Sequence, residues 1–209
     1  MLNNEFILLG YSGHSYVCID VALQTDWKIK GYVTTKESLS NPYHLTYLGN
    51  EKDQSVSKQI QASNYFIAIG DNKIRQEVAF NLGLKNLINL IHPKSIVSKF
   101  VELGNGCLVN AAAVINPNTK IGEGVICNTA SVIEHDCFVS DFTHIGPGAV
   151  VCGNVTIGEC SFIGANAVIK NNIKIGKNCT IGAGSVVIND VADGEIVVGN
   201  PARKIKVKS

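Results

Sequence analysis

Aliphatic residues recur at every sixth position through nearly half of the chain. The register runs from Val97 to Val187 without an insertion, and Cys127 is the one of its sixteen positions that is not aliphatic. A period of six predicts a short strand with an inward apolar side chain and then a turn, so that three hexads close one coil and coils stack. The pattern therefore predicts an all-β parallel β-helix built from hexapeptide repeats. The positions are Val97, Leu103, Val109, Ile115, Ile121, Cys127, Ile133, Val139, Ile145, Val151, Ile157, Ile163, Ile169, Ile175, Ile181 and Val187.

We count the aliphatic position as the first place of each hexad. The second place is then often glycine or asparagine, which we interpret as a turn residue that tolerates positive φ. These residues are Gly104, Asn110, Gly122, Gly146, Gly158, Gly164, Gly176 and Gly182. The fifth place is mostly small, and Cys107, Cys137 and Cys179 stand there, where cysteine acts as a small interior hydrophobe. The seven cysteines include no Cys-x-x-Cys pair, so we expect free thiols.

A different pattern precedes the repeats, in which short apolar runs alternate with helix-like segments. Such alternation predicts a small parallel sheet in a Rossmann-like α/β subdomain. The expected strands and helices are strand 5–9, a helix from about 14 to 23, strand 28–33, a strand from 65, helix 73–82 and a last strand 87–91. We accordingly divide the chain into an α/β domain at 1–92, a β-helix at 93–192 and a non-repeating cap at 193–209.

Charge and hydropathy narrow the function classes. The 18 basic and 17 acidic residues give a net charge of +1, which offers no strong field for nucleic acid or an anionic membrane. No apolar run approaches the ~20 residues of a membrane helix, and the start Met1-Leu-Asn-Asn-Glu lacks the features of a signal peptide. We expect a soluble cytoplasmic protein without a nucleic-acid or membrane partner.

Two turns in the α/β part are candidate ligand sites. Gly10-Tyr-Ser-Gly-His14 and Gly70-Asp-Asn72 each follow a strand and open a helix, so their N–H groups and helix N-termini could hold a diphosphate. They lack the full G-x-G-x-x-G pattern of dinucleotide-binding proteins. Two tight turns without a ligand remain the alternative.

One hexad departs from the repeat by carrying three polar residues, Glu134, His135 and Asp136. A histidine beside a carboxylate can act as a general base, and a solvated turn is the alternative. His144 follows nine residues later, half of an 18-residue coil, so the two histidines cannot stack on one face. Either they meet across a subunit interface, or His144 is a surface residue.

Four segments together carry a family resemblance over nearly the whole chain. They are Gly10-Tyr-Ser-Gly-His14, Phe66-Ile-Ala-Ile-Gly-Asp-Asn72, Asn128-Thr-Ala-Ser-Val-Ile-Glu-His-Asp-Cys137 and Gly199-Asn-Pro-Ala-Arg203. The chain resembles bacterial nucleotide-sugar N-acetyltransferases that act on UDP-4-amino-sugars, within a two-domain group that also contains sialic acid O-acetyltransferases. The resemblance implies a left-handed β-helix and a homotrimer with acetyl-CoA lying between adjacent β-helices.

The resemblance also implies roles for individual residues. His135 matches the family's general base and Asp136 its acidic partner, which is usually glutamate. Three residues match the acetyl-CoA site: His144, Ala165 and Ala183. The nucleotide-sugar pocket corresponds to Ser12, Gly13, His14 and Gly70, with Thr34 and Thr35 standing where the family can have acidic residues. The implied chemistry is direct transfer from acetyl-CoA to the sugar amine, without a metal.

Other functions remain open at this stage. A sugar O-acetyltransferase of the sialic acid type would share this two-domain layout. A zinc hydratase on the same β-helix would need three converging histidines, and the repeat region contains only His135 and His144. A non-catalytic trimeric sugar-binding protein would use the polar hexad as a mere turn. The sequence names neither the sugar nor its nucleotide.

Overall fold

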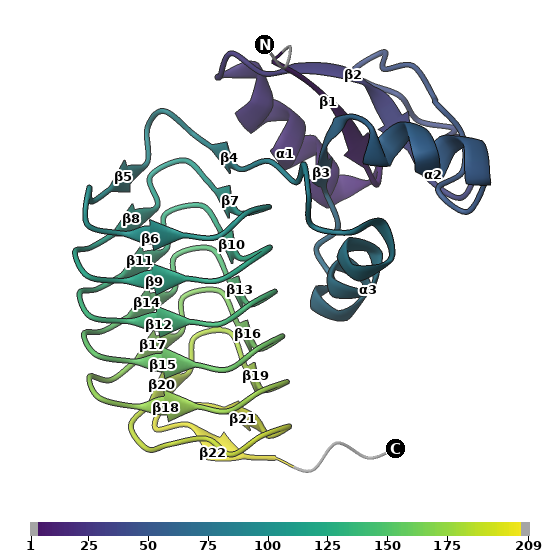
Figure 1. The fold of residues 1–209 in the computed structure, drawn as a ribbon. Coiled ribbons are helices and arrows are strands. Elements are labelled where there is room, and N and C mark those ends of the chain that lie inside the picture. The colour runs from purple at the N-terminus through teal and green to yellow at the C-terminus, as the bar shows by residue number, and fades with distance from the viewer. Residues whose placement is uncertain (1–3, 206–209) are drawn as a thin grey trace.

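The computed structural model describes residues 4–205, so the first three residues of the expected α/β domain and residues 206–209 of the expected cap lie outside the described range. Figure 1 shows a small α/β unit lying beside the upper end of a tall prism of stacked coils. Both parts of the expected fold class, a Rossmann-like subdomain and a parallel β-helix, are confirmed.

The α/β unit is built on a three-stranded parallel sheet in the order β2-β1-β3. Its strands are β1 (Glu5–Leu9), β2 (Lys28–Val33) and β3 (Asn64–Ile67), and its helices are α1 (Gly13–Leu23), α2 (Gln54–Gln61) and α3 (Asn72–Leu82). These strands and the helices α1 and α3 agree with the sequence expectation. Helix α2 was not expected, because Ile60 is its single buried residue and the rest of the segment is polar except for Val56.

The expected last strand of this sheet, residues 87–91, is wrong. Leu87 makes only an isolated parallel bridge to Tyr65. The chain then turns into the β-helix, where the Leu90 N–H donates to the Cys107 carbonyl at 2.9 Å. Leu90 belongs to the same buried cluster as Leu108 and residues of β1 and α1. One apolar run thus serves two structures, because the core of the α/β unit continues onto the wall of the β-helix.

The coils form three faces, in which the strands from β4 to β20 pair in parallel at intervals of 18 residues, as Val132 does with Val150. The six-stranded face contains β5 (Ile96–Val97), β8 (Val114–Ile115), β11 (Val132–Ile133), β14 (Val150–Val151), β17 (Val168–Ile169) and β20 (Val186–Val187). The five-stranded face contains β6 (Glu102–Leu103), β9 (Lys120–Ile121), β12 (Phe138–Val139), β15 (Thr156–Ile157) and β18 (Lys174–Ile175).

The eight-stranded face carries the α/β unit and ends in an antiparallel strand pair. It contains β4 (Leu90–Ile91), β7 (Leu108–Val109), β10 (Ile126–Cys127), β13 (His144–Ile145), β16 (Phe162–Ile163), β19 (Thr180–Ile181), β21 (Ile196–Val198) and β22 (Arg203–Lys204). Strand β21 pairs in parallel with β19, and β22 runs antiparallel to β21. The segment expected as a cap therefore adds its own strands to this face.

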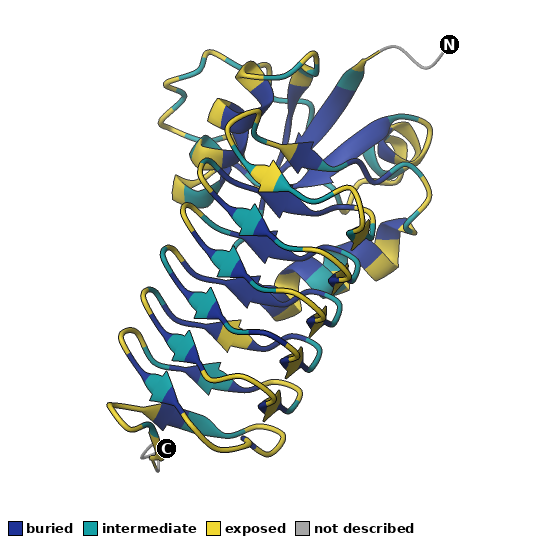
Figure 2. Cartoon of the chain, turned by 90° about the vertical axis from the view of Figure 1, so that its left-hand side faces the viewer, coloured by how far each residue is buried: buried dark blue, intermediate teal, exposed yellow. Residues whose placement is uncertain are grey.

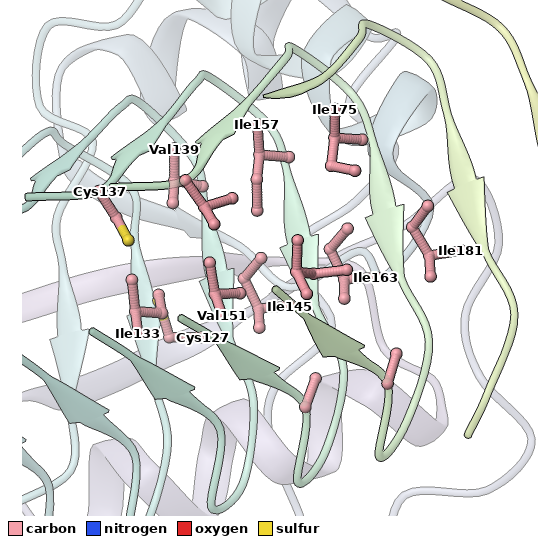
Figure 3. Close-up of a cluster of buried hydrophobic side chains, with 14 of the residues drawn as sticks. Cys127, Ile133, Cys137, Val139, Ile145, Val151, Ile157, Ile163, Ile175 and Ile181 are labelled. Carbon is pink, nitrogen blue, oxygen red and sulfur yellow. The ribbon is translucent and has the colours of Figure 1, made fainter. Parts of the chain in front are cut away.

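The sixfold register is confirmed, because each expected anchor is the second residue of one of the strands β5 to β20. Figure 3 shows these side chains, Ile145 and Ile163 among them, stacked inside the prism. Cys107, Cys137 and Cys179 are buried free thiols, as expected, and burial raises the pKa of Cys107 to about 12. Three buried hydroxyls at the fifth place, those of Thr119, Thr143 and Ser161, donate to carbonyls of the next coil, as Ser161 does to Gly176 at 2.7 Å.

The interpretation of the second-place glycines as positive-φ residues is wrong. Positive φ occurs two residues later, at the fourth place of every hexad from Gly106 to Gly184. Where the second place is glycine, the next coil leaves no room for a Cβ: a Cβ on Gly164 would lie 2.6 Å from the Ala183 nitrogen. The close stacking of coils, and not the turn conformation, selects these glycines.

The outward-facing residues differ between the three faces. On the six-stranded face all are apolar, and Figure 2 shows that face as a row of mostly half-buried strands. They are Ile96, Val114, Val132, Val150, Val168 and Val186. The five-stranded face is mostly polar, with Lys120 and Glu102 paired at 3.0 Å. On the eight-stranded face Leu108 and Ile126 are buried in a cluster with the α/β unit.

We expect Ile163→Ala to lower the free energy of unfolding by about 2–5 kcal/mol, through lost burial and the cavity left behind. Ile163 is fully buried within the stack, between Ile145 and Ile181. Denaturant unfolding checks this, with Thr156→Ala on the exposed five-stranded face as the control. A loss below about 1 kcal/mol for Ile163→Ala would contradict its place in a close-packed interior.

Candidate active site

His135 and Asp136 lie in the turn between β11 and β12, at the corner where the six-stranded and five-stranded faces meet. The His135 Nδ1 and the Asp136 Oδ2 are 2.7 Å apart, and the two side chains are 58% and 52% exposed. The backbone at Asp136 has φ 60°, a conformation that aspartate tolerates better than most residues. The hydrogen bond from His135, followed by one from Asn118, lowers the pKa of Asp136. The carboxylate is therefore ionised at neutral pH and faces the imidazole.

The imidazole of His135 packs against the next coil at Gly153. A Cβ on Gly153 would lie 2.8 Å from both Cε1 and Nε2 of His135, so any side chain there would displace the ring. Glu134, the third polar residue of this hexad, is turned away from the pair, and its Oε2 accepts a hydrogen bond from the Asn116 Nδ2 at 2.9 Å. The histidine and Asp136 therefore form a separate two-residue unit on an open corner.

His144 lies elsewhere, on β13 of the eight-stranded face beneath the α/β unit. It is only 9% exposed, so its interpretation as a surface residue is wrong. Its ring lies edge-on to Phe162 with centroids 5.1 Å apart, and its Nε2 is 3.1 Å from the Asn128 Nδ2. The residue is buried because the α/β unit covers this face, which hexad spacing alone does not reveal.

His14 meets His144 at this junction, with ring centroids 6.1 Å apart. Gly70 lies next to the His14 ring: a Cβ on Gly70 would be 3.5 Å from it. Burial, reinforced by the charge of Arg75, lowers the pKa of each histidine to about 4. The Gly70 backbone lies close enough to oppose this slightly at His144, but the buried His144 Nδ1 has no partner with hydrogen-bond geometry. Both rings are neutral at pH 7.

The structure thus brings together residues that the resemblance assigned to two different ligands. His14 and Gly70 were expected in the nucleotide-sugar pocket and His144 at acetyl-CoA, and all three meet within one chain. Ala165 lies at the corner between the eight-stranded and six-stranded faces, one coil from Ala183. The Gly184 N–H donates to the Ala165 carbonyl at 2.8 Å there. This corner and that of His135 flank opposite edges of the six-stranded face.

A cavity of about 230 Å³ opens at the carboxyl ends of β1 and β2. Thr34 and Thr35 line it, together with Leu9, Gly10, Val33, Glu51, Ile69, Ile74 and Val78. The Thr34 hydroxyl is engaged with the Lys36 carbonyl. The Glu51 Oε2 is buried without a hydrogen-bond partner. Sequence reasoning missed Glu51, because the fold brings it from a separate loop to the two threonines.

Ser12 and Gly13 lie at the start of α1, where the Ser12 N–H is engaged by the Ser15 hydroxyl. A Cβ on Gly13 would meet nothing within 4 Å, so this turn is open. Ser12 and Gly13 thus belong to the α/β unit, whereas His135 lies at a corner of the prism between β11 and β12.

Arg75 of α3 joins the two parts of the chain and was also missed. It is 1% exposed, and its guanidinium donates to the carbonyls of Gly124 at 2.8 Å, Phe142 at 2.9 Å and Ile69 at 2.9 Å. Burial lowers its pKa to about 10, which leaves it charged at neutral pH. An arginine in a helical pattern normally predicts a solvated side chain, so no local signal marks this role.

Among residues 4–205, no group of three or more histidine, cysteine, aspartate or glutamate side chains is placed so that it could bind a metal ion. Over the same range, no helix has the length and apolar character to cross a membrane.

A small α/β unit on a parallel β-helix, with a histidine–carboxylate pair at a corner of the prism, defines a hexapeptide-repeat transferase architecture. Residues 5–82 match the PglD N-terminal domain family, and residues 154–189 match the bacterial transferase hexapeptide (six repeats) family. The chain is 40% identical over 108 residues to UDP-N-acetylbacillosamine N-acetyltransferase of Bacillus subtilis. That alignment covers half of this chain and half of the curated relative.

Solved structures extend the similarity over nearly the whole chain. PerB from Caulobacter crescentus, in complex with CoA and GDP-perosamine, has a TM-score of 0.90 and 30% identity, covering 97% of both chains. The acetyltransferase domain of PglB from Neisseria gonorrhoeae, in complex with acetyl coenzyme A, has a TM-score of 0.89 and 33% identity, covering 97% of this chain and all of that one. The chain belongs to the hexapeptide-repeat family of nucleotide-sugar N-acetyltransferases.

We expect the two buried histidines to make the fold sensitive to acid. Their pKa is about 4 in the folded chain, against the ordinary value of 6.5 expected when the chain is unfolded. Their contribution to stability is therefore complete above pH 6.5 and is lost as the pH falls through 4. Between pH 7 and pH 5 the free energy of unfolding should fall by on the order of 1–2 kcal/mol for each histidine. The double variant His14→Gln, His144→Gln cannot take up these protons and should show a flatter pH dependence. Denaturant unfolding at several pH values measures this. If the free energy of unfolding depends on pH equally in the wild type and the double variant, the burial of neutral rings is contradicted.

Proposed function

We propose that the chain transfers an acetyl group from acetyl-CoA to the amine of a nucleotide-linked amino-sugar, with His135 as the general base. Family membership supports the class of reaction. The observation that carries the assignment to this chain is the His135–Asp136 pair, 2.7 Å apart and held on an exposed corner where a substrate can reach it.

In the proposed reaction the sugar amine attacks the thioester carbonyl of acetyl-CoA. The C–N bond of the amide forms as the C–S bond breaks, and His135 accepts the amine proton and returns it to the departing sulfur. Asp136 accepts the Nδ1–H of the imidazole, which leaves the Nε2 lone pair for the substrate. A covalent enzyme intermediate is unnecessary, because two bound substrates can react directly.

Each substrate has a candidate binding region. The cavity at Thr34, Thr35 and Glu51 has apolar walls suited to a nucleoside, and the buried Glu51 Oε2 would accept a donor from it. The open N-terminus of α1 at Ser12 and Gly13 suits a diphosphate. For acetyl-CoA we propose the corner of Ala165 and Ala183, following the family resemblance.

We further propose a homotrimer closed through the six-stranded face. That face presents a continuous row of outward β-branched residues, whereas the five-stranded face is mostly polar and the eight-stranded face carries the α/β unit. The corner of His135 and the corner of Ala165 flank this row on opposite sides. A threefold ring through this face would bring the His135 corner of one chain toward the Ala165 corner of the next. The catalytic site would then draw on two chains.

An acyl-CoA assay against UDP-, dTDP- and GDP-linked amino-sugars, with hydroxyl acceptors included, tests the reaction. We expect turnover with an amine acceptor and a fall in kcat of about 10²- to 10⁴-fold in His135→Ala, the usual effect of losing a general base. The side chain is exposed, so the fold should be retained. Thr156→Ala on the five-stranded face is the control. Near-normal kcat in His135→Ala would refute the base assignment.

The trimer is tested by placing a charge on the row of valines. Val150→Glu puts a carboxylate in the middle of the six-stranded face, where burying an unpaired charge is costly, and should shift the protein to monomers in sedimentation velocity. Thr156→Glu, on the next strand β15 of the five-stranded face, should leave the mass unchanged. A trimeric Val150→Glu variant, or a wild-type monomer that is active, would rule out assembly through this face.

A further inference from the structure

A ladder of side chains runs along the corner of the prism that carries His135. Asn118, Asp136, Asn154 and Asn172 follow one another at intervals of 18 residues, and all have left-handed backbone with φ between 58° and 63°. Within the ladder the Asn154 Nδ2 donates to the Asn172 Oδ1 at 2.8 Å. The Asn118 Nδ2 donates to the Asp136 Oδ1 at 3.2 Å in the same way. Asp136 is thus a carboxylate in a position that otherwise holds asparagine.

The carboxylate of Asp136 changes the hydrogen bonds that the ladder can form at this position. An asparagine has one acceptor oxygen and one donor nitrogen, and it can use both along the stack. Ionised Asp136 has two acceptor oxygens and no proton to donate to Asn154. One oxygen therefore continues the ladder toward Asn118, while the other is released to face the imidazole of His135 at 2.7 Å.

Packing alone does not hold this pair in place. The side chains of His135 and Asp136 are both more than half exposed, so packing contacts restrict the carboxylate only on one side. The hydrogen bond from Asn118 adds the missing restraint. The opposite orientation of the Asn118 amide would set its oxygen against the carboxylate, so the amide nitrogen must face Asp136.

We infer that Asn118 is a positioning residue that holds the Asp136 carboxylate in line with the Nδ1–H of His135. The inference rests on the proposed function, in which His135 is the base. Asn118 acts one coil away from the histidine and does so through Asp136. It thereby keeps the proton on Nδ1 and the Nε2 lone pair directed at the substrate.

A pair of glycine variants separates this role from a structural one. Glycine adopts positive φ without strain, so neither Asn118→Gly nor the matched control Asn172→Gly should disturb its turn. Asn118→Gly removes the donor to the carboxylate, and Asn172→Gly removes a rung of the same ladder that does not touch Asp136.

We expect Asn118→Gly to lower kcat by about 10-fold, with both KM values within about twofold of wild type. This is less than the roughly 10²- to 10⁴-fold that a general base contributes, because His135 itself is retained. The pKa of the Asp136 carboxyl, followed by ¹³C NMR, should rise toward its ordinary value, because one of the two hydrogen bonds that lower it is gone. Asn172→Gly should leave kcat, KM and this titration unchanged.

The outcomes are distinguishable. If His135→Ala is inactive while Asn118→Gly keeps normal kcat, the role of Asn118 is overturned and the proposed function stands. Equal losses in Asn118→Gly and Asn172→Gly also overturn it, because the effect is then that of the ladder as a whole. If wild-type protein turns over no acceptor, the proposed function fails and the role of Asn118 fails with it. The Asp136 titration tests the contact independently of activity.

Discussion

The stacking of each residue on the residue 18 positions later is the constraint on which the rest of the structure depends. It aligns Ile145 with Ile163 inside the prism and leaves no room for a Cβ where coils approach each other most closely, as at Gly164. Because both backbone and side chains repeat, every outward residue belongs to a row that runs along one face or corner. A residue that differs in type from the rest of its row therefore alters the surface at one defined place.

The candidate site is a local change of this kind. The corner row of asparagines contains one carboxylate, Asp136, and the coil beyond His135 has glycine, Gly153, where a side chain would displace the imidazole. Rigid repeats suit this purpose, since the backbone of the site is held by hydrogen bonds to coils on both sides, such as that from the Asn154 N–H to the His135 carbonyl at 3.0 Å. The candidate pair itself lies at the surface, with both side chains more than half exposed.

The second determinant is the buried junction between the α/β unit and the eight-stranded face. Arg75 is held there by backbone carbonyls and has no carboxylate partner among the described residues, so its charge is balanced by oriented dipoles. This junction buries His144 and His14 and leaves the six-stranded face as the apolar face that the chain itself does not cover. The position of the α/β unit thus makes the eight-stranded face a buried junction and leaves the six-stranded face uncovered.

The sequence by itself determined the β-helix, its register and the elements β1, α1, β2, β3 and α3 of the α/β unit. An uninterrupted period of six, or a strand–helix alternation, depends only on which side chains can share an interior. It also singled out His135 and Asp136 as a departure from the repeat. Only the tertiary structure decided that residues 87–91 divide between two structures, that His144 and Arg75 are buried, and that Glu51 lines the cavity with Thr34 and Thr35. Those outcomes depend on contacts between segments far apart in the chain, and periodicity describes only a segment and its own repeats.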